Sequence, residues 1–126
     1  MTDARLEAVR SALDGARESW GESGETTLDI GLEYVTGEPV QVVVRKRGHR
    51  WTFGDAGRAV RLAGAPEGWL AAAERVVTEE GMNVNRAGVV FVPAVERPGR
   101  DLARLALRLG ESSHAVFAEL VDFAPE

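Results

Sequence analysis

The chain has 126 residues, no cysteine and a formal net charge of −5, with 15 Lys and Arg against 20 Asp and Glu. This length suits a single domain over residues 1–126, and the lack of cysteine excludes disulfides and thiolate zinc sites. Hydrophobic residues make up 44% and charged residues 28%, a globular composition, and the acidic balance argues against general binding to a phosphate backbone.

The N-terminal segment is predicted to be a helix over residues 3–20, because its apolar residues recur at steps of three and four. These residues are Leu6, Val9, Leu13, Ala16 and Trp20. Thr2 or Asp3 is the expected cap, and Gly21 is the expected end.

Three strands are predicted next. Residues 27–33 alternate between apolar and polar side chains, residues 40–45 are rich in valine, and Trp51 and Phe53 alternate with polar neighbours in residues 50–53. Turns at residues 36–39 and 47–49 separate them, so the segment is expected to be an antiparallel meander.

The second half of the chain is mixed. After a turn at residues 54–57, residues 59–62 fit either a short strand or a helical turn. A helix is expected from Pro66 to Gly81, followed by a hairpin over residues 82–92 that Pro93 ends. The C-terminal segment to Phe123 is predicted to be helical, either as one helix or as two divided near Gly110.

The element order α-β-β-β-α-β-β-α predicts an α+β fold, with an antiparallel sheet and helices packed mainly on one face.

Residues 44–123 resemble a bacterial and phage family known as domain of unknown function 1828. The resemblance is carried by a strand that enters the Asp-x-Gly turn Asp55-Ala56-Gly57, a helix ending at Gly81, a short hairpin and a long apolar C-terminal helix. The family usually has a second acidic residue where this chain has Gly54, so a paired-carboxylate role does not carry over. The resemblance implies no activity.

The element order, size and acidic charge are also similar to those of type III secretion chaperones and YbjN-like proteins, which dimerise and bind segments of partner proteins. This second resemblance is one of topology alone, and a shared fold does not by itself transfer a function.

A cluster of cations surrounds the turn between the second and third predicted strands. Residues 41–61 carry the cations Arg45, Lys46, Arg47, Arg50, Arg58 and Arg61 against the single carboxylate of Asp55. Arg45, Lys46, Arg47 and Arg50 are candidates to clamp phosphates while Trp51 stacks on a base. The alternative is a solvated turn with Trp51 in the core, as charge runs usually indicate.

The other candidate motifs favour structural roles. The Gly54–Gly57 segment has the GxxG spacing of a nucleic-acid clamp, but it follows a strand and contains Asp55, as a structural turn does. His49 and His114 lack metal-ligand spacing, and no nucleophile elbow, P-loop or dinucleotide motif is present. We therefore expect no catalytic residues, no metal and no cofactor.

The C-terminal helix has an unusually broad apolar arc, which is typical of a helix buried on two sides. One side would face the sheet. The other would face either the rest of the core or a second protein chain, for which Leu107, Phe117 and Val121 are the candidate contacts.

The sequence therefore predicts a non-enzymatic protein-interaction or regulatory domain, chaperone-like and homodimeric, that binds a protein partner. The alternative is a nucleic-acid-binding accessory protein that uses the cations at 45–50. No signal-like N-terminus and no apolar run of roughly 20 residues is present, which predicts a cytoplasmic protein that is not bound to a membrane. The arginine-rich, lysine-poor composition suggests a bacterial source.

Overall fold

Five antiparallel strands form one sheet in the computed structural model, which describes residues 3–123. In chain order they are β1 (Ser23–Glu33), β2 (Pro39–Arg47), β3 (Arg50–Gly54), β4 (Asn83–Val84) and β5 (Val90–Val95). In space they follow the order β1-β2-β3-β5-β4. The predicted meander is therefore the first three strands, and the predicted hairpin adds the last two with β5 against β3.

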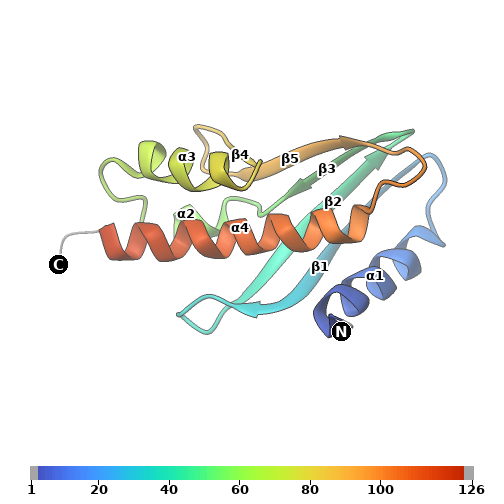
Figure 1. The fold of residues 1–126 in the computed structure, drawn as a ribbon, viewed down its shortest axis with the longest axis horizontal. Helices are drawn as coiled ribbons and strands as arrows, with labels where there is room; N and C mark the ends of the chain where they lie inside the picture. The colour runs from blue at the N-terminus through green and yellow to red at the C-terminus, as the bar shows by residue number, and fades with distance from the viewer. Residues whose placement is uncertain (1–2, 124–126) are drawn as a thin grey trace.

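Four helices accompany the sheet: α1 (Ala4–Arg17), α2 (Arg58–Leu62), α3 (Trp69–Glu79) and α4 (Leu102–Phe123). Figure 1 shows α4 lying obliquely across the strands, with α1 beside one half of it and α3 beside the other. α4 contacts β1, β2, β3 and β5, and each other helix contacts α4. The α+β class and the one-sided arrangement of helices are thus confirmed, with α2 as a short addition that the sequence left open.

The alternating strand pattern decides which side chains enter the core, because successive residues of a strand point to opposite faces. In β2, Val40, Val42 and Val44 are fully buried beneath α4, while Gln41 and Val43 between them are only partly covered. Trp51 and Phe53 are buried in β3 in the same way, with exposed Thr52 between them. One face of the sheet therefore makes the core.

The first helix is shorter than its apolar stripe predicts. It begins at Ala4 and ends at Arg17, and Asp3 caps it, because its carboxylate accepts hydrogen bonds from the N–H groups of Arg5 and Leu6. Trp20 leaves the helix to pack its ring 5.9 Å from that of Trp51. Tertiary packing of a large aromatic ring outweighed the helical pattern at this position.

Pro93 does not end the last strand, as the sequence predicted, but lies inside β5. The N–H of Asp55 donates to Val90 and that of Glu96 to His49, so Val90 and Glu96 bond toward β3. Pro93 is an odd number of residues from both, so its nitrogen points to the outer edge, where no N–H is needed for the β3 ladder.

The C-terminal helix is continuous through Gly110, which settles the one-or-two-helix question. Gly110 lies against β1 and β2: a Cβ here would overlap the Cδ1 atom of Ile30 and approach Val42 Cγ2 to 3.2 Å. The glycine is therefore a close-approach residue that lets a long helix lie flat on the sheet, and not a helix breaker.

Candidate functional site

Among the buried polar side chains of the described residues, the carboxylate of Asp55 accepts the most hydrogen bonds. Asp55 lies at the turn between β3 and α2. Its Oδ1 accepts from the N–H groups of Gly57 at 2.8 Å and Val90 at 3.0 Å, and its Oδ2 accepts from the hydroxyl of Ser113 at 2.7 Å and the N–H of Ala59 at 3.4 Å. The side chain is 1% exposed. Buried carboxylates are tolerated when donors surround them in this way.

The network continues to Tyr34, whose hydroxyl lies 2.7 Å from that of Ser113. Burial raises the pKa of the Tyr34 phenol, although the hydrogen bond with Ser113 opposes this. The rings of Phe117 and Tyr34 also pack in an edge-to-face arrangement, with centroids 5.3 Å apart. Asp55 thus ties the β3 end, α2, β5 and α4 together and, through Ser113, the segment after β1. A hydrogen-bond network that connects this many elements indicates a structural role.

The Gly54–Gly57 segment has the hydrogen bonds of a structural turn. Ala56 and Gly57 both have positive φ angles, 58° and 75°, and the chain turns so that the N–H groups of Gly57 and Ala59 donate to the carboxylate of Asp55. Because that carboxylate faces the interior, the turn presents no anion site to solvent.

The predicted phosphate clamp at 45–50 is divided between the two faces of the sheet. Trp51 is 1% exposed and lies in the core. Lys46, which pairs with Trp51 across the strands, donates to the carbonyls of Gly21 and Glu22 at 3.4 and 3.3 Å. Arg45 forms an ion pair with Glu25. The structure thus separates the expected stacking ring from the cations, and the core role of Trp51 is the one observed.

Trp51 also has a specific polar partner. Its indole N–H donates to Glu96 at 3.0 Å, and the guanidinium of Arg17 donates to the same carboxylate at 2.8 Å while lying 5.0 Å from the Trp51 ring centroid. The indole hydrogen bond, together with the charge of Arg17, holds the pKa of Glu96 below its ordinary value despite some burial. This cluster joins α1 to the end of β5.

The other face of the sheet has no helix over it within residues 3–123. We call it the open face and define it by the outward side chains of β2, β3 and β5. These are Gln41, Val43, Arg45, Arg47, Arg50, Thr52, Phe91, Pro93 and Val95. Apolar side chains gather on β5, where Val95 is 57% exposed and Phe91 is partly exposed.

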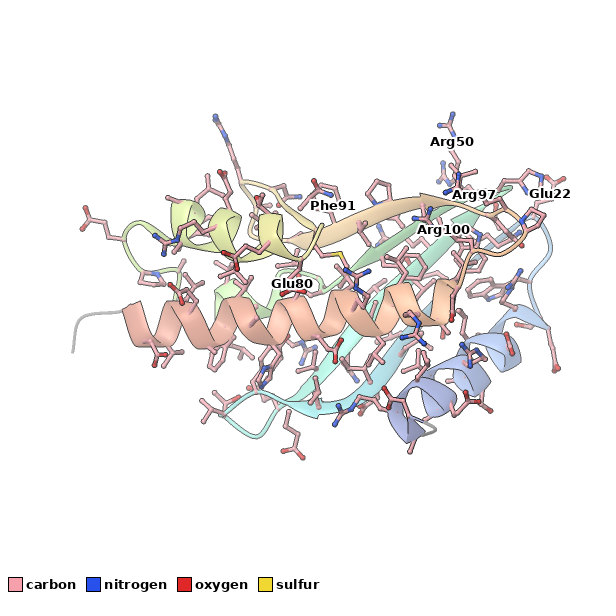
Figure 2. The ribbon with its side chains drawn as sticks, viewed as in Figure 1. Glu22, Arg50, Glu80, Phe91, Arg97 and Arg100 are labelled. Atoms are coloured by element: carbon pink, nitrogen blue, oxygen red, sulfur yellow. The ribbon has the colours of Figure 1, made fainter. Side chains whose placement is uncertain are left out.

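Cations gather at one end of the open face. Arg47 lies opposite Arg50 across the strands, and Arg50 lies opposite Val95. Figure 2 shows Arg50 with Arg97 and Arg100 at the end of β5 that leads to α4, while Phe91 lies nearer the other end. A shallow depression of about 550 Å³ lies among these arginines and is also lined by Thr52, Pro93 and Val95.

Sequence reasoning identified Arg45, Arg47 and Arg50 but missed the contribution of β5 and the loop after it. The available sequence signal was the unbroken apolar run of residues 90–95, which the prediction of a strand end at Pro93 cut short. Arg97 and Arg100 lie in the loop after β5 and belong to no helical or strand pattern in the sequence. Only the pairing of β3 with β5 brings them beside Arg50.

The predicted partner contacts on α4 lie mostly inside the domain. Leu107 is 4% and Phe117 is 3% exposed, so the rest of the core covers both. Val121 is 42% exposed. The broad apolar arc of α4 is therefore explained by packing against the sheet on one side and the other helices on the other.

Within residues 3–123, no three His, Asp or Glu side chains converge as metal ligands would, and no helix is both long and apolar enough to cross a membrane. The ring of His114 stacks on Tyr34, with centroids 6.4 Å apart.

Comparisons with known protein families, with curated proteins and with solved structures found no match. The resemblances in sequence pattern and topology therefore stay predictions.

Proposed function

We propose that the chain is a non-enzymatic protein-interaction domain that binds a partner protein with the open face of its sheet. The observation that carries this proposal is the uncovered face itself, with an apolar strip on β5 beside exposed arginines. Arginine and aromatic side chains are enriched at protein interfaces, whereas lysine is depleted. Lys46, the only lysine, is turned away from this face.

The buried polar groups support a role without catalysis. The donors around Asp55 are three backbone N–H groups and Ser113, and all of them also fix the fold. A catalytic acid or base needs to reach its substrate, whereas this carboxylate is 1% exposed.

The nucleic-acid alternative has weaker support. Its main support in the sequence was an aromatic ring that could stack on a base, but that ring, Trp51, lies in the core. Of the four cations proposed for it, Arg45 pairs with Glu25 and Lys46 bonds to carbonyl groups, which leaves Arg47 and Arg50. The net charge of −5 adds a general repulsion of phosphate.

Site-specific photo-cross-linking tests the proposal. A photoreactive phenylalanine analogue is placed at Thr52, in the centre of the open face, or at Ser11, an exposed residue of α1, as the control. After illumination in a lysate of the source organism, we expect a discrete protein adduct at Thr52 and none at Ser11. An adduct of twice the chain mass identifies the partner as a second copy.

Equal labelling at both positions, or none at Thr52, contradicts the proposal. Prior nuclease treatment provides the remaining comparison: a protein adduct survives it, whereas capture through nucleic acid is lost and transfers the assignment to the alternative.

A further inference from the structure

The cationic side chains of this domain differ in whether they have a partner within the protein. Six arginines form ion pairs with carboxylates, and four other cations donate hydrogen bonds to backbone carbonyls. Among the described residues, the side chains that do neither are Arg47, Arg50, Arg86, Arg97 and Arg100. Four of these five lie together at one end of the open face, and we call Arg47, Arg50, Arg97 and Arg100 the arginine cluster.

The arginine cluster is arranged at a cost to the free protein. Arg47 and Arg50 are direct cross-strand partners, and like charges in such positions are destabilising. The carboxylates near this end include those of Glu22 (labelled in Figure 2), Glu25, Glu96 and Asp101. Glu25 is paired with Arg45, and Asp101 is paired with Arg10 and Arg104. Glu96 is already engaged by Trp51 and Arg17, and Glu22 forms no ion pair with any described residue. The cluster therefore carries a positive charge that a partner is left to balance.

Apolar surface lies directly beside the charge. Pro93 and Val95 line the same depression as Arg50, Arg97 and Arg100. A ligand that matched this surface would combine several anionic groups with an apolar side chain, which a protein segment does and a phosphate backbone does not. Because Pro93 offers no N–H at the outer edge of β5, such a segment would lie on the face and would not extend the sheet there.

We propose that the arginine cluster binds an acidic segment of the partner protein, with its carboxylates on the arginines and an apolar side chain over Pro93 and Val95. This inference rests on the proposed function and adds the chemistry of the partner. Arginine suits the role because its planar guanidinium donates two parallel hydrogen bonds to one carboxylate.

Fluorescence anisotropy with defined probes tests the inference. The probe is a short fluorescein-labelled peptide of Glu and Leu, compared with the same peptide carrying Gln in place of Glu and with a labelled oligothymidine. The full chain is expected to bind the acidic peptide in preference to both, with an affinity that falls as salt is added.

Charge reversal locates the site. The double variant Arg50→Glu, Arg97→Glu is expected to weaken the acidic peptide at least about tenfold, because two attractive contacts become repulsive. Arg86→Glu makes a reversal of the same kind at the far end of β5, in the hairpin, and is expected to change affinity by less than about twofold. All three side chains are exposed, and thermal unfolding of each variant verifies that it remains folded.

The inference is overturned if the Gln peptide binds equally well, if Arg86→Glu weakens binding as much as the double variant, or if oligothymidine is preferred. It is separable from the proposed function. If the Thr52 adduct forms equally well in the double variant, the open face binds a protein but not through acidic groups. If the acidic peptide binds while Thr52 captures no protein, the cluster recognises acid but the proposed function fails.

Discussion

The hydroxyl of Ser113 donates a hydrogen bond of 2.7 Å to the carboxylate of Asp55, and neither residue is more than 1% exposed. The neighbouring Ser112 is equally buried, yet its hydroxyl has no hydrogen-bond partner among the described residues. Burial of the hydroxyl is therefore compensated by hydrogen bonds in one of these adjacent serines of α4 and not in the other. One completes a polar network, and the other carries an unmet cost of burial.

These two serines should respond oppositely to the same substitution. Ser113→Ala is expected to lower the free energy of unfolding by about 1–3 kcal/mol, because the carboxylate of Asp55 and the phenol of Tyr34 both lose a buried partner. Ser112→Ala is expected to leave it unchanged or raise it. Urea unfolding followed by circular dichroism measures both values. A similar loss in the two variants would show that the hydrogen bond to Asp55 contributes nothing specific.

Two glycines inside helices form a second opposed pair. Gly15→Ala should stabilise the fold by up to about 1 kcal/mol, because alanine favours helix and nothing lies within 4 Å of the new methyl group. Gly110→Ala should instead destabilise it by roughly 1–3 kcal/mol, because the methyl group overlaps Ile30. Thermal unfolding measures each change.

A compensating substitution checks the cause of the Gly110 effect. Ile30→Val removes the Cδ1 atom that the new methyl group meets, so Ile30→Val should cost less in the Gly110→Ala background than in the natural chain. Additive effects would mean that α4 does not approach β1 as closely as the structure shows.

The fall in the free energy of unfolding at acidic pH should depend in part on Glu96. Its pKa is lowered in the folded state from an ordinary value of 4.5, chiefly by the indole hydrogen bond. A carboxyl of this kind stabilises the fold above its ordinary pKa, and the contribution is lost as pH falls through the folded pKa. Glu96→Gln keeps an acceptor for Trp51 but cannot titrate, so its unfolding free energy should fall less between pH 5 and strongly acidic solution.

The exposed Glu67, which forms no ion pair with any described residue, supplies the matched control for that measurement. Glu67→Gln should retain the full acid dependence. Chemical unfolding across the pH range compares the variants, and an unchanged slope in Glu96→Gln would refute the assignment.

The arginine cluster should oppose stability in the absence of a partner. Arg47→Gln removes one charge from the like-charged pair with Arg50, so we expect the free energy of unfolding to rise by up to about 1 kcal/mol at low ionic strength. The gain should vanish in high salt, which screens exposed charges. Unfolding curves at two salt concentrations measure this, and a loss of stability at low salt would indicate that Arg47 has a favourable partner in the free protein.

Local patterns in the sequence were enough to predict the class of the fold. Valine-rich alternation over residues 40–45 and the three-to-four spacing of Leu102, Leu105 and Leu109 follow from local geometry, since strands and helices bury side chains with different periods. Both elements form where they were predicted. The arginines at 45, 47 and 50 were also found, because a turn between two strands must lie near the surface.

Which of these residues lie together depends on tertiary contacts. The pairing of β3 with β5 placed Arg97 and Arg100 beside Arg50. The direction of hydrogen bonding in β5 admitted Pro93, and contact with Ile30 gave Gly110 its place in a continuous helix. These outcomes depend on register and on contacts between residues distant in sequence, which no local period encodes.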